Sequence, residues 1–142
     1  MRKIRALLVL LALAVAGRVE AQSTFVVVVH ESNPMTSITR DELSKVFLKK
    51  ITVWRNKQPV VVVDQADKSP VRLQFTRSIH RREITSVQSY WQQQIFAGRA
   101  VPPQVRATDA EVLAFVAGNP SAVGYVSAGA ALPAGVKALT VQ

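Results

Sequence analysis

Apolar residues recur along the chain in two patterns, continuous runs that predict strands and one-sided stripes that predict helices. The runs at 24–30 and 59–63 are rich in valine, which is typical of strands buried on both faces of a sheet. Runs at 122–127 and 136–141 are shorter strand candidates. Gly124 interrupts the third run, so we expect another backbone or a ligand to approach closely there.

Helical stripes lie between these runs, and polar residues mark where they begin. Thr39 with Glu42, and Thr108 with Glu111, have the spacing of a capping box. A further helix is predicted near Glu83 and ends before Gly98. The first three stripes are Leu43, Val46 and Phe47; Val71, Phe75 and Ile79; and Ile84, Val87, Trp91 and Ile95. Strands that alternate with helices predict an α/β fold.

Residues 1–21 have the pattern of a secretory signal peptide. A basic start precedes an apolar run, and Val19 and Ala21 occupy the small-residue positions of a cleavage site. The run is shorter than the roughly 20 residues that span a bilayer, so no membrane insertion is expected after cleavage. The chain has no cysteine, which excludes disulfides and a lipid-modified cysteine. We therefore expect an exported, periplasmic protein with one domain at 22–142.

The net charge of the chain limits the classes of partner that are expected. Segment 1–21 holds four basic residues and Glu20, which leaves +6 of the formal net charge of +9 for residues 22–142. Positive charge favours anionic partners, and export makes nucleic acid an improbable one.

The segment DQADKSPVRLQF (64–75) offers the best candidate chemistry. It follows the run at 59–63, so residues 64–69 are expected to form a loop where α/β sheets place their ligands. Ser69 and Pro70 are typical of a helix start, whose free N–H groups attract anions. In that interpretation the Ser69 hydroxyl and the N–H groups of Val71 and Arg72 face an anion. The alternative is that Ser69 only caps its own helix.

Enzyme chemistry finds little support in the sequence. His30 and His80 are the only histidines, and neither has a second metal ligand at a useful spacing. Nucleophile-elbow, phosphate-loop and dinucleotide motifs are absent, and Asp64 and Asp67 lack the ladder of a calcium loop. We therefore expect neither an enzyme nor a cofactor.

Two other groups of residues allow a functional or a structural interpretation. The basic cluster of Arg72, Arg77, Arg81 and Arg82 is either a binding surface or, more commonly for such a pattern, a solvated helix face. Tyr90 and Trp91 could stack on a ligand, but the helical spacing of Trp91 favours a place in the core.

Beyond these patterns, three segments resemble the phosphate-type periplasmic substrate-binding proteins. Residues 32–54 contain an asparagine-proline turn, a capped helix ending in Phe47, and Trp54 a few residues later. The strand before Asp67 and Ser69 resembles the approach to the family's anion loop, and residues 119–127 resemble its return strand. The similarity extends over the whole of 22–142, particularly to short, single-lobe members.

The resemblance implies a type II periplasmic-binding-protein fold, with a mostly parallel central sheet flanked by helices. It implies capture of phosphate or a related oxyanion for an ABC permease. Asp67 matches an aspartate that accepts a proton from the ligand, Ser69 matches a serine, and Ser32 is a further candidate. Gln65 stands in place of the family's arginine, Pro70 in place of a glycine, and Val71 in place of a threonine.

Two hypotheses follow. The first is a solute-binding protein for phosphate or a similar oxyanion, which a single open lobe binds weakly because solvent screens the charges. The second is an envelope interaction module that keeps the fold but contacts a protein partner, through Arg77, Arg81 and Arg82.

Overall fold

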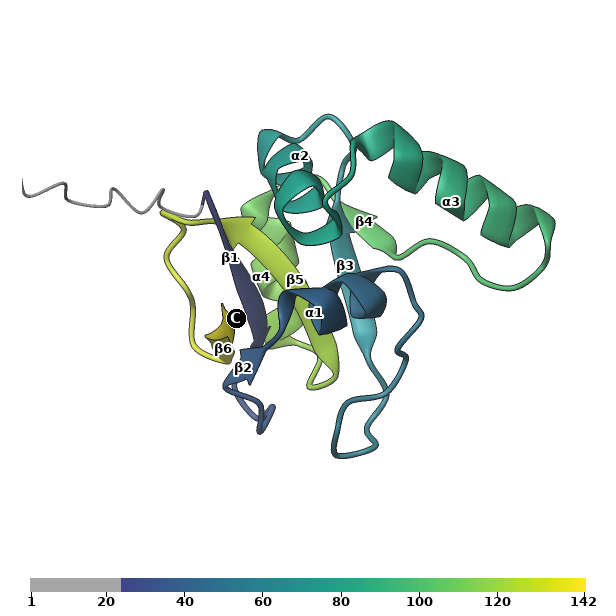
Figure 1. Ribbon diagram of the computed structural model, residues 1–142. Helices are drawn as coiled ribbons and strands as arrows, with labels where there is room; N and C mark the ends of the chain where they lie inside the picture. Colours follow the sequence, from purple (N-terminus) through teal and green to yellow (C-terminus); the bar gives the residue numbers. More distant parts are fainter. Residues whose placement is uncertain (1–23) are drawn as a thin grey trace, which may run out of the picture.

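The computed structural model describes residues 24–142, so the predicted signal peptide at 1–21 lies outside the described residues. A six-stranded sheet with the order β2-β6-β1-β5-β3-β4 forms the centre (Figure 1). Its strands are β1 (Phe25–His30), β2 (Ser37–Ile38), β3 (Val61–Gln65), β4 (Gln104–Arg106), β5 (Ala122–Ser127) and β6 (Val136–Val141). The helices are α1 (Arg40–Phe47), α2 (Pro70–Phe75), the π-helix η1 (Thr76–His80), α3 (Ile84–Phe96) and α4 (Asp109–Ala117).

Strand β1 runs opposite to the other five strands. It pairs antiparallel with β5 and β6, whereas β3 is parallel to both β4 and β5, and β2 is parallel to β6. The predicted α/β fold with a mostly parallel sheet is therefore confirmed. Because of this direction, the carboxyl ends of β1 and β3 lie at opposite ends of the sheet.

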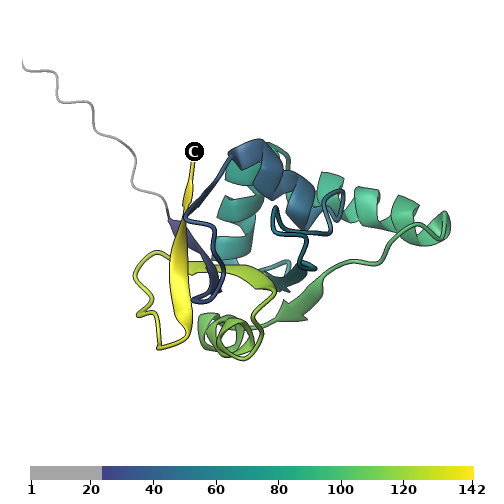
Figure 2. The same ribbon diagram turned by 90° about the horizontal axis from the view of Figure 1, so that it is seen from below.

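The sheet buries both faces, as the valine-rich runs predict. Val27 and Val29 of β1 belong to the core beneath α1 and α2, while Val28 faces the core formed with α4. Figure 2 shows α1 and α2 on one side of the sheet and α4 on the other.

An aromatic cluster joins the first helical layer to the sheet. The rings of Phe75 from α2 and Tyr125 from β5 stack with centroids 3.9 Å apart, and Phe47 from α1 lies 4.6 Å from Phe75. Such pairs contribute about 0.5–1.5 kcal/mol beyond the area that they bury. They fix α2, and with it the segment that precedes α2, against the end of β3.

Helix starts follow the sequence closely. The hydroxyls of Thr39, Ser69 and Thr108 each accept a hydrogen bond from the backbone N–H three residues later, which caps α1, α2 and α4. Strand β3 differs from the prediction of 59–63, because it continues to Gln65. Short edge strands β2 and β4 were not predicted.

Helix α3 projects from the body, and residues after it return to β4 (Figures 1 and 2). We call Ile84–Val105 the arm. Val87 and Trp91 are buried against Leu48 and attach its base to the body. The Tyr90 hydroxyl donates to the Leu48 carbonyl at 2.7 Å. The expectation that Trp91 is a core residue is confirmed, whereas the inclusion of Ile95 in the buried stripe is wrong, because the helix extends past the body at that turn.

Among the described residues, we find no helix that combines the length and the apolar character needed to cross a membrane.

Gly124 lies in a close contact, but valine side chains approach it most closely, rather than the backbone or ligand that the sequence predicted. A Cβ atom added there would lie 2.7 Å from Val63 Cγ1 and 2.8 Å from Val112 Cγ1. We expect Gly124→Ala to lower the free energy of unfolding by about 1–3 kcal/mol, because those packed valines must move. Gly129→Ala is the matched control, since nothing lies within 4 Å of its added Cβ. Urea denaturation measures both, and equal effects would contradict the packing argument.

Candidate functional site

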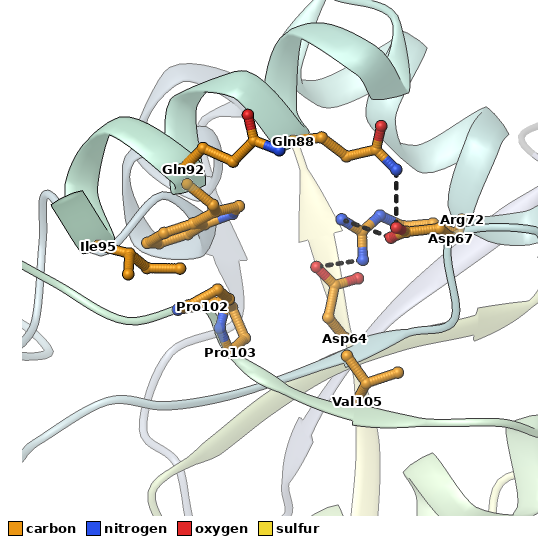
Figure 3. Close-up of a pocket in the computed structure, with 10 residues that line it drawn as sticks. Asp64, Asp67, Arg72, Gln88, Gln92, Ile95, Pro102, Pro103 and Val105 are labelled. Atoms are coloured by element: carbon orange, nitrogen blue, oxygen red, sulfur yellow. Dashed lines mark hydrogen bonds and ion pairs between the residues drawn. The ribbon is translucent and has the colours of Figure 1, made fainter.

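A pocket of about 510 Å³ opens between the carboxyl end of β3 and the arm. Figure 3 shows Gln88, Gln92 and Ile95 on one side, and Asp64, Asp67 and Arg72 at one end. The full lining consists of Asp64, Asp67, Arg72, Gln88, Trp91, Gln92, Ile95, Pro102, Pro103 and Val105. The pocket therefore has a charged end next to the sheet and an apolar end along the arm.

Its charged end is built on a buried ion pair. Arg72 Nη1 lies 2.6 Å from Asp64 Oδ2, and both residues are 5% exposed. The same guanidinium nitrogen donates to the Gln65 carbonyl at 2.9 Å, while the Tyr125 hydroxyl donates to Asp64 Oδ1. Charges removed from water are tolerated only with such partners, so each group here depends on the others.

Burial is the largest influence on the pKa values of Asp64 and Tyr125. Burial raises the pKa of Asp64, and the neighbouring Arg72 charge opposes that rise. Burial, reinforced by the charge of Asp64, raises the pKa of Tyr125. The tyrosine therefore remains a neutral hydrogen-bond donor to the carboxylate.

Gln65 extends this network toward the neighbouring elements. Its amide nitrogen donates to the Tyr125 carbonyl at 3.0 Å and to Asp109 Oδ1 at 2.9 Å. Its amide oxygen accepts from the Ser69 hydroxyl at 3.0 Å. The glutamine thus links β3 to β5, to the first residue of α4 and to the cap of α2.

At the mouth of the pocket, Asp67 remains accessible, with its side chain 52% exposed. Gln88 Nε2 donates to Asp67 Oδ2 at 2.8 Å, and Arg72 Nη2 lies 3.8 Å from Asp67 Oδ1 (Figure 3). Two carboxylates and one guanidinium give this end a formal charge of −1. A fully ionised anion is therefore repelled, whereas an anion that retains a proton can donate it in a hydrogen bond to Asp67.

Of the four predicted site residues between positions 67 and 72, the structure places two in the pocket lining. Asp67 and Arg72 line the pocket, Ser69 lies behind them, and Val71 is buried in the main core. The Ser69 hydroxyl is engaged on both sides, because it donates to Gln65 and accepts from the Arg72 N–H at 3.4 Å. The segment 64–69 is also not all loop, since Asp64 and Gln65 complete β3.

Ser32 lies apart from this group. It follows β1, whose antiparallel direction carries it to the opposite end of the sheet. There it accepts or donates a 2.7 Å hydrogen bond with His30 Nδ1 and lines a smaller hollow with Trp54 and Ser121. The predicted grouping of Ser32 with Ser69 and Asp67 therefore does not form.

The sequence did not predict several residues of the site. The position of Asp64 and Gln65 at the end of an apolar run could have indicated their role, because a charged residue there must be buried with a partner. No comparable signal identified Gln88, Pro102 and Pro103, which reach the pocket only because the arm turns back. Within residues 24–142, no group of three or more acidic or histidine side chains is placed to hold a metal ion.

This chain resembles known proteins both in sequence and in fold. Residues 21–141 match a family described as the PBP superfamily domain. Among curated protein sequences, none matches the chain. Solved structures supply the further comparisons.

A Clostridium perfringens protein, described as a phosphate ABC transporter substrate-binding protein and solved with bound phosphate, is 24% identical with a TM-score of 0.65. The match covers 83% of this chain and 44% of that one. An ABC-type phosphate transport receptor from Vibrio cholerae is also 24% identical, with a TM-score of 0.66, and covers 83% and 46%. PstS from Borrelia burgdorferi gives 18% identity, a TM-score of 0.59, and 84% and 47% coverage.

These matches confirm the predicted fold, a single lobe of the periplasmic-binding-protein type. The chain spans less than half the length of the solved relatives that it matches.

Removing Arg72 tests the ion pair. We expect Arg72→Met to lower the free energy of unfolding by about 3–5 kcal/mol, because Asp64 would remain buried without its cation. Adding Asp64→Asn should recover much of the loss. Arg77→Met is the control, since Arg77 pairs with Glu83 at the surface and such pairs contribute about 0–1 kcal/mol. Chemical denaturation at neutral pH measures all three, and equal losses at positions 72 and 77 would refute the buried pair.

His80 provides a pH test of the packing behind the pocket. Burial, with smaller contributions from Arg72 and Arg82, lowers the pKa of His80 to about 4, and Ser44 Oγ lies 2.8 Å from its Nδ1. The unfolded chain binds that proton more strongly, so stability should fall as the pH drops from about 6.5 to 4 and stay constant above. The predicted loss is about 1–3 kcal/mol.

We expect His80→Gln to flatten this acid-side slope while keeping a hydrogen bond to Ser44. His30→Gln is the matched control because His30 lies at the far end of the sheet. Urea denaturation at a series of pH values measures the slopes. A slope that is unchanged by His80→Gln would show that another group titrates.

Proposed function

Because the chain belongs to the PBP superfamily domain family, we propose that it is an exported solute-binding protein for phosphate or a related oxyanion. The observation that carries this proposal is the arrangement of Asp67, Arg72 and Gln88 at the mouth of the pocket. It lies at the carboxyl end of β3, where α/β sheets commonly place ligands. The Clostridium perfringens relative holds bound phosphate, which supports the ligand class.

The charges of the pocket select the protonation state of the ligand. Arg72 Nη2 and Gln88 Nε2 are hydrogen-bond donors, whereas ionised Asp67 only accepts. A phosphate that retains a proton satisfies both kinds of group, because its hydroxyl donates to Asp67 and its oxygens accept from the other two. Sulfate carries no proton at neutral pH and would place unshielded charge against Asp67.

Affinity is expected to be weak for two reasons. Arg72 already neutralises Asp64, so only part of its charge is available to a ligand. The pocket is also open along the arm, and water there screens the remaining interaction. Ser69 and the N–H of Arg72 support the site through the α2 cap rather than from the pocket wall.

The same proposal includes export through the predicted signal peptide, work in the periplasm and delivery to an ABC permease. It assigns binding and no catalysis to the chain, and it invokes no cofactor.

A second candidate is an envelope interaction module, as the sequence also suggested. The supporting observation is that Arg81 and Arg82 are exposed next to the base of the arm. Arg77 is bonded to Glu83, so it presents less free charge than the other two. In this candidate the fold is retained and an acidic protein surface replaces the solute.

Titration with two oxyanions tests the first candidate. We expect residues 22–142 to bind phosphate with a dissociation constant of about 1 mM or weaker, near −4 kcal/mol, and to bind sulfate less well. Asp67→Asn should remove this preference, because an amide donates to sulfate and accepts less well from a phosphate hydroxyl. Chemical-shift changes in two-dimensional NMR measure both affinities.

Asp41→Asn in α1 is the control, since Asp41 is exposed and distant from the pocket lining. Ser69→Ala should weaken phosphate binding by loosening the α2 cap. A folded sample whose spectrum does not change at several millimolar phosphate would leave the interaction module as the better account.

A further inference from the structure

The arm has an unusual composition for this chain. From Ile84 to Val105 the only charged residue is Arg99, although charged residues form 19% of the sequence and residues 22–142 are strongly basic. Protein interfaces are depleted of charge at their centres and enriched in aromatic residues. The arm therefore has the composition of a contact surface rather than of a solvated helix.

Large apolar side chains are also exposed on the arm. Phe96 is 97% exposed at the end of α3, and Val101 is 64% exposed on the returning segment. Ile95 and Val105 are about half exposed and line the pocket. Exposed apolar groups scattered singly are normal, but here four of them lie on one arm and two of those four line the pocket.

The apolar end of the pocket and the exposed Phe96 side chain are complementary in character, one concave and one protruding. Trp91, Ile95, Pro102 and Val105 provide an apolar wall, while Phe96 of the same arm points its side chain into solvent. A surface that carries both a protrusion and a matching pocket can pair with its own copy about a two-fold axis. We propose that the chain forms a homodimer in which α3 packs antiparallel against its mate and Phe96 of each copy enters the pocket of the other.

Charge favours a second copy over other occupants. The charged end of the pocket carries a formal charge of −1 from Asp64, Asp67 and Arg72. Arg99 follows Phe96 by three residues, so an entering arm brings its one cation toward exposed Asp67. Of the net charge of +6 on residues 22–142, the arm carries only Arg99, so contact through the arms brings little like charge together.

The size of the arm suits such a contact. A standard interface uses about 20–30 residues from each partner, and the arm with the pocket rim is of that order. An anionic membrane surface, by contrast, attracts lysine and arginine beside the apolar residues, and the tip of the arm offers only Arg99.

The dimer would also change the solute site. Arg99 of the partner subunit would add a positive charge to the end of the pocket that holds Asp67. Phe96 of the partner subunit would exclude water from the apolar end. The dimer itself does not rest on the proposed oxyanion binding.

Sedimentation velocity of residues 22–142 over a wide concentration range tests the dimer. We expect a monomer–dimer equilibrium whose dissociation constant rises at least tenfold with Phe96→Asp. Because Phe96 is almost fully exposed, this change should leave thermal stability intact. Val53→Asp is the matched control, since Val53 is 51% exposed away from the pocket and should leave the equilibrium unchanged.

Two further variants test the arrangement. Arg99→Glu should weaken the dimer, and adding Asp67→Lys should restore it if these residues face each other. The chain has no cysteine, so Phe96→Cys protein can be mixed with Gln88→Cys protein. We expect the mixed disulfide to form faster than either symmetric one.

A protein that remains monomeric at all concentrations overturns the proposal. So does a dimer that Phe96→Asp leaves intact. A monomer that binds phosphatidylglycerol vesicles through Phe96 would also overturn the dimer, and would indicate that the arm contacts a membrane surface. A monomer that binds neither vesicles nor a second copy would overturn it in favour of a different protein partner.

Discussion

Asp64 places a carboxylate at the buried end of a central strand, and the structure around it follows from the need to compensate that charge. Arg72 reaches it from the first turn of α2, and Tyr125 reaches it from β5. The buried pair therefore holds a helix and two strands in one arrangement. Since an unpartnered buried charge is far more costly than a partnered one, this end of the sheet has little freedom to move.

This constraint also shapes the solute site. The guanidinium that would otherwise be free for an anion is held by Asp64, and the Ser69 hydroxyl is held by Gln65. What remains at the surface is a carboxylate with two nearby donors, Asp67 with Arg72 and Gln88. Such a group favours a ligand that both donates and accepts, which distinguishes a protonated oxyanion from a fully ionised one.

The arm completes the pocket. Val87, Tyr90 and Trp91 attach α3 to the body near Leu48, and the segment that follows α3 supplies Pro102, Pro103 and Val105 to the pocket wall. The solved relatives are more than twice as long as the part that matches this chain, and they resemble it as one lobe. Arg99 is the single charged residue of the arm, so the arm presents a mostly apolar and uncharged polar surface beside the open pocket.

The sequence by itself determined four of the six described strands, the helix starts and the fold class, because these depend on local properties. Runs of valine, hydroxyl caps at Thr39, Ser69 and Thr108, and a glycine in β5 act within a few residues of chain. Only the tertiary structure decided which of the polar residues meet. The direction of β1 separated Ser32 from Ser69, and the extension of β3 buried Asp64 with Arg72. The return of the arm placed Gln88 beside Asp67. Such pairings depend on strand direction and on contacts between distant segments, and local sequence patterns do not encode either one.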